Sequence, residues 1–144
     1  MSTWTHVAGV IRIDALYSTE EFVFKKSLGK FVTWESPEEV WDEFEKYPER
    51  FTPTGSEGGI QYSIWKNPKK NYLAKYTVSI FGDLRDYSNI KEIEDWFNSI
   101  LYEKDLLIRD AIIHITCGDG EESIIKYDYD RADQEWQKRH KDED

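Results

Sequence analysis

Polar and apolar residues alternate along the first segment of the chain, from Trp4 to Asp14. A period of two residues is typical of a strand with one buried face. The row expected to face the core is Thr5, Val7, Gly9, Ile11 and Ile13. The row expected to face away from it is Trp4, His6, Ala8, Val10 and Arg12. We therefore predict a strand over residues 4–14.

Residues 15–35 have two interpretations, and the sequence leaves both open. Apolar stretches at 22–24 and 31–34 flank a basic segment, as in a hairpin. Alternatively, Ser18 and Glu21 have the spacing of a helix capping box, with Gly29 as the helix stop.

Two later segments repeat their apolar residues at helical spacing. In the first, Ser36 is placed to cap a helix and Pro37 to open it, and the helix should end before Pro53. Its apolar residues are Val40, Trp41, Phe44 and Tyr47. The apolar stripe of the second helix is Ile90, Ile93, Trp96, Phe97, Ile100 and Leu101.

Three further strands are expected, at about 60–65, 72–81 and 107–117. Turn-forming residues at 66–71 join the first two as a hairpin. In the last strand the predicted core row is Leu107, Ala111, Ile113, Ile115 and Cys117. The opposite row is Ile108, Asp110, Ile112, His114 and Thr116.

This order of elements predicts an α+β fold, a ferredoxin-like βαββαβ sandwich. Right-handed crossovers would place two helices on one face of a four-stranded antiparallel sheet with strand order 4-1-3-2. The other face of the sheet would be open. We expect one domain over residues 1–127, followed by a polar, charged C-terminal tail at 128–144.

Composition narrows the functional classes. The net charge of −10, from 29 acidic and 19 basic residues, argues against direct nucleic-acid binding and against anionic membrane surfaces. The single cysteine, Cys117, excludes an intrachain disulfide, and the three histidines form no spaced metal set. We expect no cofactor and no metal. No apolar run is long enough for a membrane span, and the N-terminal residues lack signal-peptide features, so a cytoplasmic location is expected.

The predicted topology brings several polar residues to one end of the sheet. They are His6, His114, Thr116, Ser56, Asp83 and Arg85. His6 and His114 should lie on the open face, and neighbouring strands would let them face each other across the ladder. Asp83, Arg85 and Asp86 have two interpretations, as ligand-binding residues or as caps of the second helix, and capping is favoured.

Two histidines on adjacent strands, with a threonine nearby, resemble the paired His-x-Thr motifs of the 2H phosphoesterases. In that family each histidine acts as an acid or base on a phosphate ester, and each threonine helps to bind the phosphate. His114-Ile115-Thr116 matches the motif, whereas His6-Val7-Ala8 has alanine in the position of threonine. The resemblance therefore implies phosphate-ester chemistry with half of the binding residues missing.

Three stretches together resemble small uncharacterised proteins of tailed bacteriophages. They are Trp4-Thr5-His6-Val7, Gly55-Ser56-Glu57-Gly58 and Phe81-Gly82-Asp83-Leu84-Arg85-Asp86-Tyr87. The resemblance spans about residues 4–117 and implies a phage context, with the host cytoplasm as the location, but no particular activity.

The leading hypothesis is a small, acidic, non-enzymatic binding protein, in the phage context an inhibitor that occupies a host protein. Its acidic contact face would be Glu39, Asp42 and Glu43 on the first helix. One alternative is a nucleotide-binding or 2H-phosphoesterase-like protein acting at the His6/His114 end. Another is a homodimer in which open sheet faces pair and bury Trp4, Trp65 and Phe81.

Overall fold

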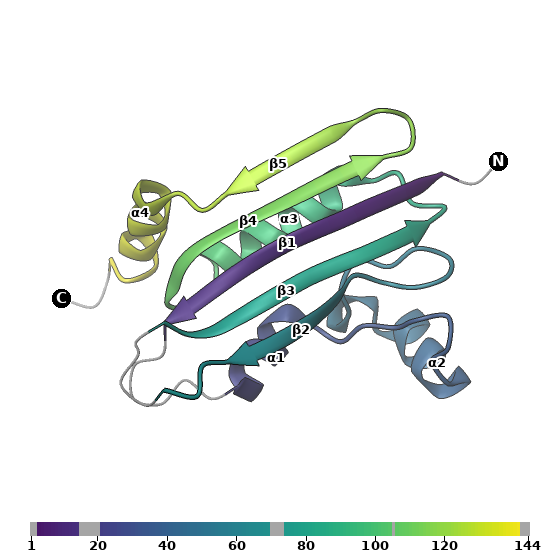
Figure 1. Ribbon diagram of the computed structural model, residues 1–144, viewed down its shortest axis with the longest axis horizontal. Coiled ribbons are helices and arrows are strands. Elements are labelled where there is room, and N and C mark those ends of the chain that lie inside the picture. The colour runs from purple at the N-terminus through teal and green to yellow at the C-terminus, as the bar shows by residue number, and fades with distance from the viewer. Residues whose placement is uncertain (1–2, 15–20, 70–73, 105, 142–144) are drawn as a thin grey trace.

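The computed structural model describes residues 3–14, 21–69, 74–104 and 106–141. Its strands and helices follow one another along the chain as shown in Figure 1. The strands are β1 (Trp4–Asp14), β2 (Gln61–Lys66), β3 (Ala74–Arg85), β4 (Ile108–Cys117) and β5 (Glu122–Lys126). The helices are α1 (Glu21–Leu28), α2 (Glu38–Lys46), α3 (Ile90–Tyr102) and α4 (Tyr129–Arg139), with a short 3-10 turn η1 (Pro48–Arg50).

All five strands form one antiparallel sheet in the order β2-β3-β1-β4-β5. The predicted ferredoxin-like sandwich is therefore wrong, because the sheet has five strands rather than four and the described chain has four α-helices rather than two. The extra strand, β5, pairs with β4 at the sheet edge. The extra helices are α1, which falls in the segment with two interpretations, and α4, which falls in the predicted tail.

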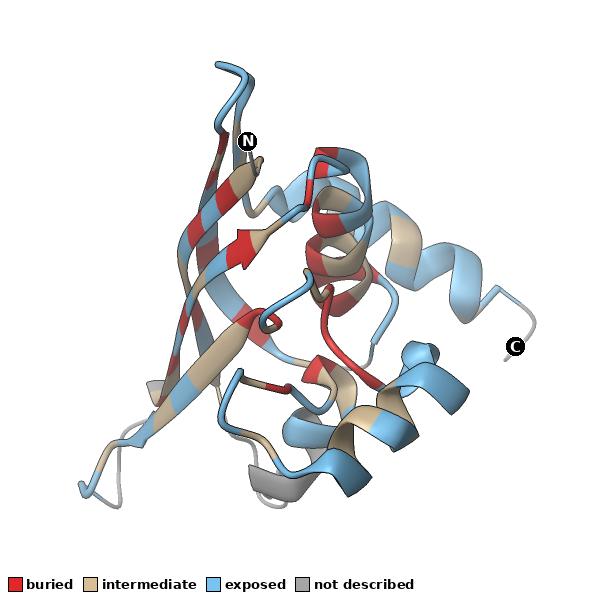
Figure 2. Cartoon of the chain, turned by 90° about the vertical axis from the view of Figure 1, so that its right-hand side faces the viewer, coloured by how far each residue is buried: buried red, intermediate tan, exposed pale blue. Residues whose placement is uncertain are grey.

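The core lies between the sheet and α3. Figure 2 shows the helices on one side of the sheet, with the buried residues of the strands alternating along their length. In β1 the predicted core row includes Val7, Ile11 and Ile13, which are at most 5% exposed. On the helix side, α3 buries Ile90, Ile93, Phe97, Ile100, Leu101 and Tyr102. None of the helices that the structure describes lies on the other face of the sheet.

A β-bulge in β4 changes the side on which its first residues lie. Ile13 of β1 pairs with Ile108, but Arg12 pairs with Asp110, so Arg109 is an extra residue. As a result Ile108 is buried and Leu107 is 44% exposed. The predicted rows of β4 were therefore wrong at these two positions, and correct from Ala111 onward.

The predicted ends of the first two helices have different outcomes. Gly29 has a φ of 99° and its N–H bonds to the carbonyl of Lys25, so it does end α1, as the helix interpretation required. Ser18, the proposed cap, lies outside the described residues. Ser36 does not cap α2: its hydroxyl accepts a hydrogen bond from Thr33 N (2.9 Å), and α2 begins after Pro37.

The segment predicted to lead into the second helix is part of a strand instead. Strand β3 continues through Asp83 and Arg85, so neither residue caps α3. That role belongs to Asn89, whose side chain accepts a hydrogen bond from Glu92 N at 3.3 Å.

Candidate functional site: the helix-free face of the sheet

The helix-free face is built from rows of residues that run across the strands. Residues that pair directly in neighbouring antiparallel strands project from the same face. The first row is Asp83, His6, Thr116 and Glu122. The second is Gln61, Phe81, Ala8, His114 and Ile124. The third is Ser63, Ser79, Val10, Ile112 and Lys126, and the fourth is Trp65, Thr77, Arg12 and Asp110. We call these four rows the sheet face.

Both predicted histidines lie on the sheet face and are exposed, as expected from the alternation. They do not face each other, however. His6 pairs with Thr116, whereas His114 pairs with Ala8 in the next row. The expected direct pairing was therefore wrong by two residues along the strand, a shift that no local sequence signal encodes.

Each histidine contacts a carboxylate on a different strand. His6 Nδ1 lies 2.6 Å from Asp83 Oδ1, on β3, and His114 Nε2 lies 2.9 Å from Glu122 Oε1, on β5. Because β3 and β5 flank the β1–β4 pair on opposite sides, the two imidazoles lean away from each other. An acid–base pair acting on one phosphate would need them to converge. Glu122 was not predicted as a site residue, because β5 was not predicted as a strand.

The two other predicted residues, Ser56 and Arg85, hold a loop against the end of β3. Ser56 N donates to the Arg85 carbonyl oxygen at 2.9 Å, and Ser56 Oγ donates to Asp86 Oδ2 at 2.9 Å. The Arg85 guanidinium pairs with Glu57, and the hydrogen bond to that carboxylate raises the pKa of Arg85. Asp86 adopts a φ of 54°, a left-handed conformation that turns the chain toward α3. The predicted gathering of these residues at one sheet end is confirmed, and their contacts are structural.

Large apolar side chains are exposed on the inner strands and on both edge strands of the sheet face. Phe81 is 44% exposed, Ile112 43%, Ile124 55% and Trp65 56%. They come from four different strands, with the small side chain of Ala8 between Phe81 and His114. Of these, Ile124 was missed at the sequence level. The signal that could have found it is the turn Gly118-Asp119-Gly120 followed by the adjacent β-branched residues Ile124 and Ile125.

The predicted acidic contact face on α2 lies on the helix side of the molecule (Figure 2). Glu39 and Asp42 are exposed. Glu43 instead accepts a hydrogen bond from Lys30 Nζ at 2.7 Å and lies 3.8 Å from Arg50 Nη1. Its charge is therefore compensated within the protein, and it is not equivalent to the other two carboxylates.

The part of the chain that the structure describes contains no group of three or more histidine, cysteine or acidic side chains placed to hold a metal ion. Within the same residues, no helix is both long and apolar enough to cross a membrane. No protein-family model matches this chain, and no match was found among curated proteins or solved structures. The resemblance to phage proteins stays a prediction.

Proposed function

We propose that this chain is a non-enzymatic binding protein that docks on a basic partner protein through the sheet face. The observation that carries the proposal is the group of exposed apolar side chains, Phe81, Ile112, Ile124 and Trp65, on a face that none of the described helices covers. Phe81, Ala8, Val10, Ile112 and Ile124 occupy adjacent positions in the second and third rows. Contiguous exposed apolar surface is typical of interaction sites.

The size of the face supports this role. Five strands spaced about 4.8 Å apart give a width of about 24 Å, and the stretch from His6 to Arg12 gives a length of about 23 Å. The resulting flat area is about 550 Å², and the side chains that project from it add further accessible surface. A stable interface of standard size buries about 800 Å² on each partner. The sheet face thus supplies most of one such surface.

Charge indicates the chemistry of the partner. The protein carries a net charge of −10, and the sheet face itself contains three carboxylates, Asp83, Glu122 and Asp110, and two basic side chains, Arg12 and Lys126. A partner with an apolar centre bordered by lysine or arginine would complement this arrangement and be steered toward it. A second copy would bring another ten negative charges and be repelled. In the phage context, such a partner would be a host protein that normally binds nucleic acid.

The alternative of a two-histidine phosphoesterase is less well supported. His6 and His114 each contact their own carboxylate on opposite sides of the β1–β4 pair, and Ala8 stands where the second threonine would be needed. The geometry that supports binding therefore also disfavours this reaction.

A capture experiment with matched variants tests the proposal. Wild-type protein, Ile112→Lys and Trp34→Lys are immobilised and exposed to bacterial lysate, and bound proteins are identified by mass spectrometry. Ile112 lies on the sheet face, whereas Trp34 is 76% exposed and outside it. We expect a basic protein retained by wild type and by Trp34→Lys and lost by Ile112→Lys. With the purified partner, affinity should fall as salt rises, because exposed charges are screened over about 10 Å at 0.1 M.

Two outcomes would overturn the proposal. One is a partner that Ile112→Lys still binds but that Glu39→Lys/Asp42→Lys does not, which would move the contact to α2. The other is a wild-type dimer by light scattering that Ile112→Lys converts to a monomer, which would make a second copy the occupant.

A further inference from the structure

A groove separate from the sheet face lies between α4 and the end of the sheet where β1 finishes and β4 begins. Its volume is about 460 Å³, within the range of about 300–1,000 Å³ typical of small-molecule sites. Its floor includes Leu101 and Ile108, which are 3% and 7% exposed. Figure 1 shows α4 standing beyond this end of the sheet. We call it the α4 groove.

Two aromatic side chains of α4 form the walls of the groove. Tyr129 and Trp136 are seven residues apart, so they lie about two turns, or about 10 Å, from each other on the same side of the helix. Between them lies Ala132, which also lines the groove. Because alanine is small, it fills little of the space between the two rings. A planar ring stacked between two others needs about 7 Å between their planes, twice the contact distance of about 3.5 Å, and the rise of about 10 Å along the helix between Tyr129 and Trp136 exceeds this.

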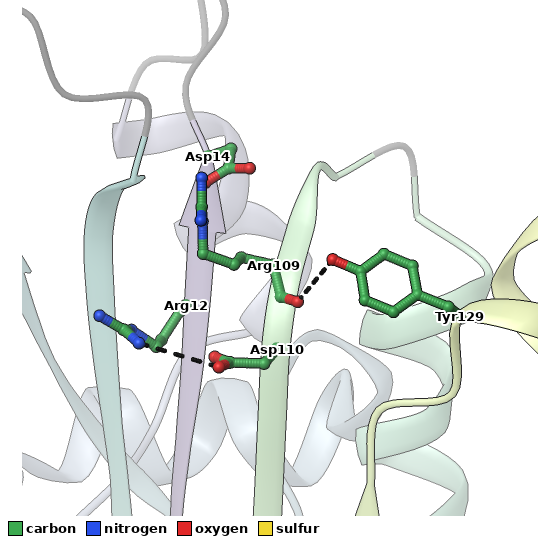
Figure 3. Close-up of polar contacts among 5 residues, drawn as sticks. All are labelled: Arg12, Asp14, Arg109, Asp110 and Tyr129. Carbon is green, nitrogen blue, oxygen red and sulfur yellow. Dashed lines mark hydrogen bonds and ion pairs between the residues drawn. The ribbon is translucent and has the colours of Figure 1, made fainter.

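Both rings are exposed and yet held in place. Tyr129 is 65% exposed, but its hydroxyl donates to the Arg109 carbonyl oxygen at 3.0 Å (Figure 3), and its ring meets Tyr127 edge to face at 5.1 Å. Trp136 is 52% exposed and stacks on His140 at 4.2 Å. Binding to rings that are already fixed requires little additional ordering.

Three basic side chains, Lys104, Arg139 and Arg109, and two carboxylates, Asp14 and Asp133, lie in or beside the groove of a protein that is otherwise strongly acidic. Lys104 and Arg139 line the groove, and the Arg139 guanidinium also donates a hydrogen bond to the Tyr102 carbonyl oxygen. Of the two carboxylates that line it, Asp14 is neutralised by Arg109, whose Nε lies 2.8 Å from Asp14 Oδ1, and Asp133 accepts a hydrogen bond from Gln137 at 3.2 Å. The pair with Asp14 also raises the pKa of Arg109.

We infer that the α4 groove is a binding site for a planar aromatic compound that carries an anionic group. The ring lies between Tyr129 and Trp136, above Ala132, and the anionic group points toward Lys104 and Arg139. This site goes beyond the proposed function, because it uses none of the residues of the sheet face.

Isothermal titration with three naphthalene probes tests the inference. The probes are 2-naphthoate, neutral 2-naphthylmethanol and the cation 2-naphthylmethylammonium. The proteins are wild type, Ala132→Leu, Trp136→Ala and the control Ala8→Leu, which makes the same change on the sheet face. We expect 2-naphthoate to bind best, Ala132→Leu and Trp136→Ala to weaken it at least tenfold, and Ala8→Leu to leave it unchanged.

A charge reversal tests the second half of the inference. Lys104→Glu should weaken 2-naphthoate about fivefold and leave 2-naphthylmethanol unchanged, and Lys46→Glu on α2 should affect neither probe. Circular dichroism checks that each variant is folded. If Ala132→Leu is unfolded, Trp136→Ala still tests the inference, because Trp136 is exposed and its removal should not unfold the protein. Equal binding by wild type, Ala132→Leu and Trp136→Ala, no binding at all, or tighter binding of the ammonium probe would each overturn the inference.

Discussion

The substitution Gly55→Ala tests how firmly the loop at residues 55–59 is fastened to the end of β3. A Cβ atom at Gly55 would come closer than 3.0 Å to the Arg85 carbonyl oxygen and lie 3.0 Å from Arg85 N. Both are backbone atoms inside a sheet, so neither can rotate away. The loop must therefore lift, and it would lose the hydrogen bonds that Ser56 makes to Arg85 and Asp86.

The expected loss follows from these contacts. Two hydrogen bonds are worth about 1 kcal/mol each, and residual strain adds about 1 kcal/mol. Alanine also lowers the conformational entropy of the unfolded chain, which offsets about 0.7 kcal/mol of this loss. We expect Gly55→Ala to lower the free energy of unfolding by about 2 kcal/mol, and Tm by roughly 6 °C for a domain of this size.

The matched control lies three residues away in the same loop. A Cβ at Gly58 would meet its nearest atom, the Val32 carbonyl oxygen, at 3.4 Å, which is an ordinary contact. Gly58→Ala should therefore change the free energy of unfolding by less than about 0.5 kcal/mol. Urea unfolding followed by tryptophan fluorescence measures both. If the two variants lose the same stability, the close approach of Gly55 to β3 is not what anchors the loop.

Three further predictions concern single side chains. Burial, and then a nearby carboxylate, raise the pKa of Tyr87 above its usual value near 10; since this raised pKa favours the folded state below pH 10, stability should fall as pH rises above 10, and Tyr87→Phe should reduce that loss in alkaline urea titrations. Glu43→Lys should lower the free energy of unfolding by about 1 kcal/mol more than Glu39→Lys, because only Glu43 has two basic partners. Purified protein should show no hydrolysis of 2′,3′-cyclic nucleotides or cyclic dinucleotides by chromatography; turnover abolished by both His6→Ala and His114→Ala would contradict the binding function.

The strands with clear alternation could be predicted from the sequence, and so could the end of the sheet where the site residues gather. β1 and β4 each place the predicted histidine on the open side. The order of the four predicted strands within the larger sheet also follows the expected 4-1-3-2. The predicted ferredoxin-like fold with four strands was nevertheless wrong. No element was predicted for β5, which has only five residues with charged ends, Glu122 and Lys126, and whose sequence does not alternate.

The contacts of the site residues could not be predicted, because they depend on register. His6 meets Asp83 because β1 and β3 pair at that position, and a shift of two residues would preserve every buried side chain while replacing this partner. The same holds for His114 and Glu122. The role of Ser56 depends in addition on the docking of its loop, to which alternation and helical periodicity do not apply.

The bulge at Arg109 allows one strand to serve both proposed sites. Beyond the bulge, β4 presents Ile112 and His114 on the sheet face. Before it, the change of side buries Ile108 in the floor of the α4 groove and exposes Leu107 along that groove. The carbonyl of Arg109 meanwhile holds Tyr129, and its guanidinium neutralises Asp14 (Figure 3). A regular strand would have exposed Ile108 on the sheet face and turned Leu107 into the core. The bulge thus ends the apolar part of the sheet face and begins the groove, so that the two surfaces can bind different ligands.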